Sequence, residues 1–270
     1  MSREAYKTEE YRGYTINIYY DDDAQSPREW DNLGTIYSNS RSYDPDNHSI
    51  EEILNDEHTG MSQEFKENYI WLKIRGYQHS GLTISVSGGY PYNDPWDSGL
   101  FGVIAVSKSK AIKEFGKKIC TKQVREKALN CLRGEVETLD MYYTGDVYGF
   151  VIEDENGDEV DSCWGYFGSE YIDKDLIPEC KSIIDSMIEK RQKTHDERIE
   201  KVKANVTLLI GNTFIFGSDC YRVGADKLFG LPLLEKATQR NGRIREEYYT
   251  DVQLSDIPED VLADMAKLVA

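Results

Sequence analysis

Alternating and helical patterns of apolar positions divide the chain into strands and helices. Residues 14–20 alternate tyrosines with β-branched residues, which predicts a strand that ends at the acidic turn Asp21–Asp23. Three further strands are predicted at residues 35–37, 69–74 and 82–86, and another at 102–107. Between residues 121 and 141, five apolar positions recur at helical spacing and predict the buried face of one helix: Val124, Ala128, Leu132, Val136 and Leu139.

A β-hairpin is predicted around Asn156 and Gly157. Apolar and β-branched residues at 147–153 and 159–164 flank this dipeptide. Both residues tolerate a positive φ, as the two central positions of a type I′ turn require. We therefore expect two antiparallel strands joined by a tight type I′ turn.

The pattern of residues 175–204 predicts a long, highly charged helix. Pro178 falls in its opening turn, where the missing N–H is harmless. An apolar stripe fills the first half and fades between Glu189 and Arg198; its members are Cys180, Ile183, Ile184, Met187 and Ile188. This pattern predicts a connector between two domains, with a solvated middle.

The C-terminal part predicts a small β-rich module closed by a helix. Its strands are expected at residues 206–210, 213–216, 220–223 and 246–253. The closing helix is expected to begin at an Asp256 N-cap. Its inward positions would be Val261, Leu262, Met265, Leu268 and Val269.

Taken together, these elements predict an α+β fold with a mixed, mainly antiparallel sheet, a long connecting helix and a small β-rich C-terminal module. We expect an acidic α+β domain at residues 1–177, the connecting helix at 178–204 and a small α+β module at 205–270. That module could form homo-oligomers or supply a second contact to a partner.

The chain is strongly acidic, with a formal net charge of −17. Residues 1–177 hold 33 acids and 18 bases, whereas residues 178–270 hold 16 acids and 14 bases. A basic stretch at 108–127 carries +6, so the rest of the first domain carries −21. Such a field repels nucleic acid and attracts basic surfaces, although acidity can also serve solubility alone.

The sequence lacks the common motifs of catalytic and ligand-binding sites. The chain shows no nucleotide-binding loop, no metal-ligand spacing and no nucleophile elbow, so no cofactor, metal or catalytic residue is assigned. The five cysteines include no CxxC pair, which is typical of reduced thiols in a cytosol. With no apolar run long enough to span a membrane, we expect a protein of the cytoplasm that contacts no membrane.

Carboxylates are the first candidate functional groups. On a helix, Glu137 and Asp140 would share a face, and Asp146 follows in the next turn. With Asp31, Asp97 and Asp161 from loops, they could bind Mg²⁺ or act as an acid and base. They could equally cap turns by accepting backbone hydrogen bonds. The acidic turns at 21–23 and 154–159 are interpreted as solvated turns.

Aromatic residues beside carboxylates are the second candidate group. Trp and Tyr are favoured at protein interfaces, and several here lie in loop-like, glycine-flanked contexts. They could also be core residues with polar tips. The predicted interface residues are Trp30, Asp31, Tyr92, Trp96, Asp97, Asp140, Tyr143, Asp146, Asp161 and Trp164.

Several motifs occur together in one order across residues 11–171: Glu29–Gly34 (EWDNLG), His79–Gly81, Pro95–Gly99 (PWDSG), Glu135–Glu137 with Asp140, Thr144–Gly149 (TGDVYG) and Asp161–Gly165 (DSCWG). In these motifs the chain resembles an uncharacterised family of proteins carried by phages and plasmids. The resemblance implies no catalytic residue or cofactor. It implies a context in which small acidic proteins block host defence.

Together, the resemblance and the acidic charge lead us to expect an anti-defence protein in the host cytoplasm. It would inhibit a defence nuclease or complex by binding its basic surface, either as a nucleic-acid mimic or by simple occlusion, without binding nucleic acid itself. One alternative is a carboxylate- or metal-dependent hydrolase that uses these acids and His79. Another is a small-molecule-binding or structural phage protein.

Overall fold

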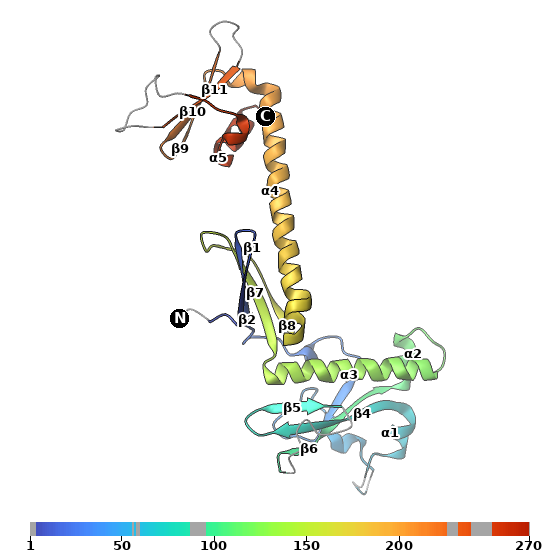
Figure 1. Cartoon of the computed structure of the whole chain (residues 1–270). Helices are drawn as coiled ribbons and strands as arrows, with labels where there is room; N and C mark the ends of the chain where they lie inside the picture. The colour runs from blue at the N-terminus through green and yellow to red at the C-terminus, as the bar shows by residue number, and fades with distance from the viewer. Residues whose placement is uncertain are drawn as a thin grey trace. The chain divides into compact units, whose positions relative to one another are not determined.

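The computed structural model describes residues 4–55, 57, 60–86, 96–225, 232–238 and 250–269. The chain divides into two compact units, Met1–Lys181 and Ser182–Ala270, each with its own strands and helices (Figure 1). The sheets are antiparallel and the helices fall between and after the strands, which confirms the α+β class. The second unit begins inside the long helix α4 (Ile177–Asn205).

The first sheet of unit 1 has the strand order β1-β2-β7-β8. Its strands are β1 (Lys7–Tyr11), β2 (Tyr14–Tyr20), β7 (Val147–Glu153) and β8 (Glu159–Phe167), all antiparallel. The sequence pattern predicts the last three. It misses β1, an edge strand whose side chains are exposed or half-buried.

This sheet has two hairpin turns, and the sequence predicted only the one between β7 and β8. Between β1 and β2, Arg12 and Gly13 have φ values of 51° and 84°, as the two central residues of a type I′ turn do. The predicted hairpin of β7 and β8 is present, but its turn is not type I′. There only Gly157 has a positive φ, of 81°, and the N–H of Asp154 donates to the carbonyl of Asp158 at 2.9 Å, which makes a longer, bulged loop.

The second sheet of unit 1 has the order β3-β6-β4-β5. It consists of β3 (Thr35–Ser38), β4 (Tyr69–Gln78), β5 (Leu82–Ser85) and β6 (Ser98–Ser107). Helix α3 (Lys122–Thr144) runs along one face of it (Figure 1). All five apolar positions predicted for this helix are buried in that contact.

The other face of this sheet is covered by a short 3-10 helix, η2 (Ile50–Ile53), and by α1 (Gln63–Asn68). Strand β6 therefore has apolar partners on both sides. Ile104 and Val106 pack on the α3 side, whereas Val103 and Ala105 pack on the other. This explains why β6 is a continuous apolar run rather than an alternating one.

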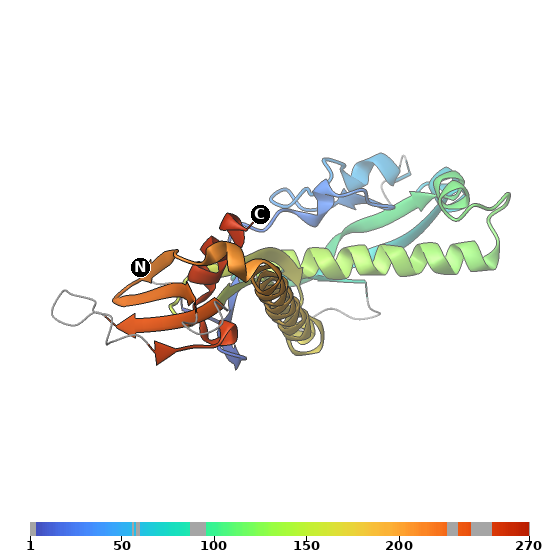
Figure 2. The same cartoon turned by 90° about the horizontal axis from the view of Figure 1, so that it is seen from above.

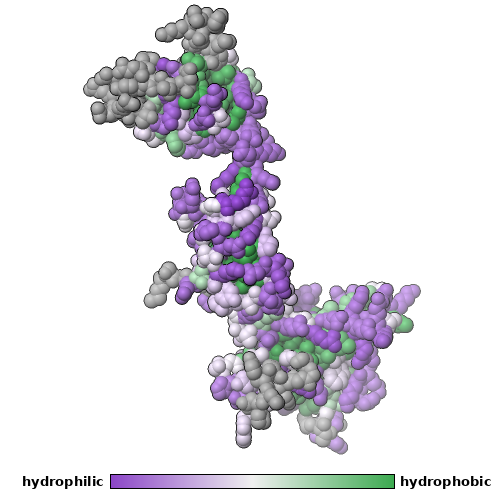
Figure 3. All heavy atoms as spheres, viewed as in Figure 1, coloured by the Kyte–Doolittle hydropathy of each residue, from purple (hydrophilic) through white to green (hydrophobic). Residues whose placement is uncertain are grey.

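Helix α2 (Lys108–Glu114) and the loop to α3 carry most of the basic stretch. Ser107 caps α2, and Thr121 caps α3 through a hydrogen bond from the N–H of Val124. The end of unit 1 around α2 is covered mainly by hydrophilic side chains (Figure 3). This tip is thus a solvated, positively charged region of an otherwise acidic unit.

Helix α4, seen nearly along its axis in Figure 2, follows a π-helical turn, η4 (Ile172–Leu176). Cys180 and Ile184 are buried, and the predicted loss of the stripe is confirmed, because residues 189–193 are all exposed. Within the described residues, no helix combines the length and apolar character needed to cross a membrane.

In the second unit, a four-stranded sheet has the order β12-β11-β10-β9. Its core includes Val202 of α4, Tyr221 and Val223 of the sheet and Leu262 and Met265 of α5. The remaining bounds are β9 (Thr213–Phe216), β10 (Asp219–Ala225), β11 (Pro232–Thr238), β12 (Thr250–Asp251), η7 (Leu254–Asp256) and α5 (Glu259–Leu268).

Three details of the predicted C-terminal module are wrong. Residues 206–209 form a 3-10 helix, η5 (Val206–Leu209), because they continue directly from α4 and bury Leu209 in the core. Asp256 ends η7 and does not cap α5. Leu268 is 61% exposed, since it lies in the last turn at the margin of the buried stripe. Of the predicted strand at 246–253, residues 246–249 lie outside the described residues.

Candidate functional site

Trp164 lies on β8 in a position that two glycines make possible. It pairs with Gly149 of β7, and a Cβ atom at Gly149 would overlap the Trp164 ring. The next residue, Gly165, has a φ of 87° and forms a bulge, so that Tyr148 pairs with Tyr166 beyond it. The indole also stacks on Tyr19 of β2, with the ring centroids 6.4 Å apart. Trp164 is thus held over the sheet while 41% of it stays exposed.

Trp30 reaches the same region from η1 (Pro27–Glu29). Ser26 caps this short helix, and Pro27 in its first turn is buried. The Trp30 and Phe167 rings form a T-shaped pair, with their centroids 5.3 Å apart and an interplanar angle of 85°. Half of the Trp30 surface remains exposed. Two tryptophans from distant parts of the sequence therefore flank one place on the surface.

Arg28 fixes η1 to the body of unit 1. Its side chain is only 4% exposed and forms ion pairs with Asp46 at 2.8 Å and with Glu135 of α3 at 2.9 Å. Glu135 also accepts hydrogen bonds from the N–H groups of Leu33 and Gly34. Burial lowers the pKa of Arg28, but the hydrogen bonds and charges of the two carboxylates outweigh it, so the net shift is upward.

Between the two tryptophans lies a cleft of about 760 Å³, which we call the tryptophan cleft. It is lined by Asp21, Asp22, Asp23, Gln25, Trp30, Trp164, Gly165 and Phe167. Asp21 is fixed at the end of β2, because its N–H donates to the carbonyl of Val147 and its carboxylate accepts from the N–H of Asp23. Asp22 and Asp23 are exposed.

The lining of the tryptophan cleft combines aromatic faces with negative charge. Three carboxylates and two indoles contribute to it, and the described lining residues include no Lys, Arg or His. A cation is attracted both by carboxylates and by the electron-rich face of an indole. The cleft is therefore suited to a positively charged group that also has apolar surface.

Two other predicted interface residues, Asp140 and Asp146, accept hydrogen bonds within the fold. Asp140 is half-buried and accepts a hydrogen bond from the N–H of Ile84 on the edge strand β5 at 2.7 Å. Asp146 accepts from the hydroxyl of Tyr148 at 2.9 Å and from the N–H of Ser169. These two carboxylates thus act as backbone and side-chain acceptors, the second of the two readings that the sequence allows.

The environment of Asp140 raises its pKa above the usual value. Burial is the largest cause, and the charge of Asp146 adds to it, whereas the hydrogen bond from Ile84 opposes it. The pKa of Tyr143 is raised to about 12, chiefly by burial and then by the charge of Asp46. Tyr143 packs against Tyr43 and Phe101, so it belongs to the core of the second sheet.

The remaining predicted residues lie away from the cleft lining. Asp31 is exposed and lines a polar hollow of about 710 Å³ to which Trp30 also contributes. Asp161 accepts from the N–H of Ser162. Trp96 is 92% exposed. A carboxylate oxygen of Asp97 lies 2.8 Å from Nδ1 of His79, which is in the turn between β4 and β5. Tyr92 lies outside the described residues.

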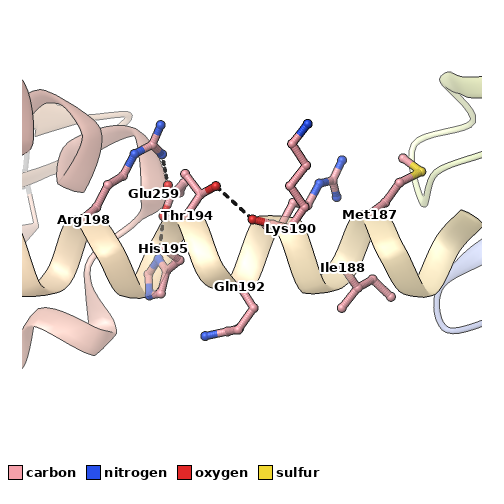
Figure 4. A pocket seen from close by; sticks show the side chains of 9 residues that line it. Met187, Ile188, Lys190, Gln192, Thr194, His195, Arg198 and Glu259 are labelled. Atoms are coloured by element: carbon pink, nitrogen blue, oxygen red, sulfur yellow. Dashed lines mark hydrogen bonds and ion pairs between the residues drawn. The ribbon is translucent and has the colours of Figure 1, made fainter.

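A second hollow, of about 800 Å³, lies beside α4 in the second unit (Figure 4). Glu259 of α5 pairs there with His195 at 2.5 Å and with Arg198. Lys190 and Gln192 point to opposite sides of the helix in Figure 4. The side chains do not converge on a common point, so this hollow has the features of open helix surface rather than of a binding site.

Sequence reasoning overlooked Arg28, Gln25 and Phe167, and it interpreted Asp21–Asp23 as a solvated turn. For Arg28 there was a signal, because it is the one base among five acids at residues 21–31. For Phe167 there was none, since its position depends on the bulge at Gly165. Among the described residues, no group of three His, Cys, Asp or Glu side chains is placed to hold a metal ion.

Comparison with known proteins identifies no family for this chain. No protein-family model matches the chain, and neither a curated protein nor a solved structure matches it. The resemblance to phage- and plasmid-borne proteins therefore stays a prediction, and function is inferred from the chemistry of the tryptophan cleft.

Proposed function

We propose that the protein is a binding protein that docks on a basic surface of another protein through the acidic, aromatic face of unit 1. In the phage or plasmid context that the sequence suggests, the partner is a host defence nuclease or complex. Binding in the host cytoplasm would occlude the surface with which that partner holds nucleic acid, and so inhibit it.

The observation that carries this proposal is the tryptophan cleft. Protein interfaces are enriched in tryptophan, which often supplies the anchors of binding. Here two are half-exposed and are held in place, Trp164 by stacking on Tyr19 and Trp30 by its contact with Phe167. A preformed anchor loses little side-chain entropy on binding, which favours slow dissociation.

Charge supports a basic partner in particular. Residues 1–177 have 15 more acids than bases, and three of those acids line the cleft. Complementary charge steers encounter and raises association rates, more than it raises affinity itself. The same field repels the phosphates of nucleic acid, so the cleft is suited to a protein that holds nucleic acid rather than to the nucleic acid.

Co-purification of the tagged protein from a bacterial lysate, at low and high salt, tests the proposal. We expect a stoichiometric basic protein that is released by salt, and we expect the purified protein to block nucleic-acid binding or cleavage by that partner. The Trp30→Ala and Trp164→Ala variants should lose the partner.

Ile119→Ala is the matched control, because Ile119 is an exposed apolar residue that lies outside the tryptophan cleft and is not a predicted interface residue. It should retain the partner as the unchanged protein does. If a captured protein remains bound to both cleft variants, or if its activity is unaffected by saturating amounts of this protein, the proposal is wrong.

A further inference from the structure

We infer that the C-terminal module forms a homodimer through strand β9 (Thr213–Phe216), whose open edge pairs antiparallel with the same strand of a second copy. This contact joins the sheets of the two modules into one continuous sheet. The inference goes beyond the proposed function, because β9 belongs to unit 2 and the tryptophan cleft belongs to unit 1.

Strand β9 has a partner on one side only. It lies at the end of the strand order of its sheet, and within the residues that the structure describes it pairs with β10 alone. The N–H of Val223 on β10 donates to the carbonyl of Asn212, the residue before β9, at 3.1 Å. Because the backbone groups of successive residues point in opposite directions, the N–H and C=O groups of Thr213 and Ile215 point away from β10.

The other sheet edges that the structure describes are protected, as edges of soluble proteins usually are. Strands β1 and β8 carry charged residues, and β12 is only two residues long. On β3 the N–H of Ile36 donates to Asp46, and on β5 the N–H of Ile84 donates to Asp140, each at 2.7 Å. Among the described edge strands, β9 alone has no charged residue, no proline and no side chain that caps its outward N–H groups.

Apolar side chains are exposed on β9 and on the segment that leads into it. Residues 204–218 include no charged residue, in a chain of which 30% is charged. Ile215 is 72% exposed and Phe216 is 43% exposed. Before the strand, Leu208 is 67% exposed and Ile210 is 38% exposed. Pairing at this edge would bury apolar surface and give the outward backbone groups their partners.

The distribution of charge favours a second copy of this chain as the partner. Residues 1–177 hold 33 acids and 18 bases, so two copies repel each other through this part of the chain. Residues 178–270 hold 16 acids and 14 bases, and β9 itself is uncharged, so two copies can meet there without that repulsion. A basic partner, by contrast, gains no electrostatic attraction from an uncharged strand.

The pattern of β9 also matches its own copy. A two-fold axis perpendicular to the sheet keeps equivalent faces on the same side, so residues opposite each other must come from the same face. Phe214 faces the core, and Thr213 and Ile215 therefore lie on the opposite face. Placing Thr213 of one copy opposite Ile215 of the other uses all the outward backbone groups and sets Phe214 opposite its own copy.

Sedimentation velocity of the full-length protein, at several concentrations in physiological salt, tests the inference. We expect a reversible equilibrium between monomer and dimer. Ile215→Lys places like charges on the shared edge and should weaken dimerisation by about tenfold or more. Ile119→Lys is the matched control, because Ile119 is 68% exposed and lies in unit 1, and it should dimerise as the unchanged protein does.

Two further variants test the backbone contact and the register. Thr213→Pro removes an N–H that points to the open edge and leaves the bonds to β10 in place, so it should weaken the dimer, whereas Thr213→Ala should not. Adding Thr213→Glu to Ile215→Lys should restore the dimer, because each new carboxylate lies opposite the new ammonium of the second copy. Circular dichroism of each variant checks that it is folded.

The response to salt separates strand pairing from attraction between charges. Screening reduces the repulsion between two acidic chains, so dimerisation through β9 should not weaken as salt rises to the physiological range. A dimer that dissociates over this range is held by charge, for example by the basic stretch 108–127 against an acidic face, and pairing through β9 is then wrong. A protein that stays monomeric at every concentration, or a dimer that folded Ile215→Lys and Thr213→Pro leave unchanged, also overturns the inference.

Discussion

Gly149 is the residue on which the position of Trp164 most directly depends. A methyl group there would overlap the indole and lie 2.9 Å from the carbonyl of Cys163. We expect Gly149→Ala to lower the free energy of unfolding by about 1–3 kcal/mol, as overpacking does, and to displace Trp164. Urea unfolding and tryptophan fluorescence measure the two effects.

Gly134 provides the control for this substitution. It lies inside α3, and nothing stands within 4 Å of a Cβ atom at that position. Gly134→Ala should therefore stabilise the protein by about 0.5–1 kcal/mol, because alanine favours a helix interior. If Gly149→Ala is as harmless as Gly134→Ala, Trp164 does not rest on the sheet as described.

Asp140 supports a prediction about pH. Its pKa in the folded protein lies above the usual 3.8, so the folded state binds a proton more readily than the unfolded state. The ionised carboxylate therefore costs stability above the raised pKa, and this cost disappears as the pH falls through that pKa towards 3.8. Asp140→Asn keeps an acceptor for the N–H of Ile84 but removes the charge.

We therefore expect Asp140→Asn to be at least as stable as the unchanged protein at neutral pH, with the advantage fading as the pH approaches 4. Asp140→Ala should instead lose about 1–3 kcal/mol, because the N–H of Ile84 loses its acceptor. Urea unfolding at several pH values measures both variants. A loss of stability in Asp140→Asn that grows at neutral pH would show that the charge itself stabilises the fold.

Among the secondary-structure elements, η1 is the one whose anchoring decides whether the cleft exists. The buried Arg28 holds it between Asp46 and Glu135. We expect Arg28→Ala to destabilise the protein by about 3–5 kcal/mol, because two half-buried carboxylates lose their counter-charge. Arg28→Lys should rescue little, since an ammonium cannot replace the paired bonds to Asp46.

Arg133 is the matched control for Arg28. It is an exposed arginine on α3 whose polar contact is with Asn130, so Arg133→Ala should change the unfolding free energy by less than about 0.5 kcal/mol. Thermal and urea unfolding of both variants test this expectation, and binding of the co-purified partner is a second readout. Similar small losses in the two variants would mean that η1 is not held by this network.

At the scale of elements, the sequence predicted what depends on periodicity and missed what depends on contacts between distant segments. The stripe of α3 could be predicted residue by residue because its 3.6-residue spacing is local. Strand β1 was missed since its turn uses Arg12, a residue type seldom found at positive φ. The bulge that presents Trp164 depends on pairing with β7, which no local pattern records.

The same distinction applies to the candidate site. Trp30 and Trp164 were predicted as interface residues from their loop-like contexts, and the structure brings them to one cleft. Asp140, Tyr143 and Asp146 were predicted on the same grounds, but their burial and hydrogen bonds give them structural roles. Whether an aromatic or acidic side chain faces solvent depends on tertiary packing, which the sequence alone does not specify.

For the whole molecule, the net charge of −17 makes stability and binding respond to salt in opposite directions. Self-repulsion among the excess acids destabilises the folded state, and added salt screens it. We therefore expect the free energy of unfolding to rise between low and physiological salt. Binding of a basic partner depends on attraction by the same charges, so its affinity should fall over the same interval.

Measuring both quantities on the same samples makes this a strict test of the acidic field. Urea unfolding gives the stability, and titration with the co-purified basic partner gives the affinity. The Glu155→Gln, Asp158→Asn variant should weaken both salt effects slightly, because it removes two charges remote from the tryptophan cleft. If salt instead lowers stability, specific ion pairs such as those of Arg28 and Glu259 outweigh the repulsion. The acidic charge would then be balanced inside the fold rather than available to a partner.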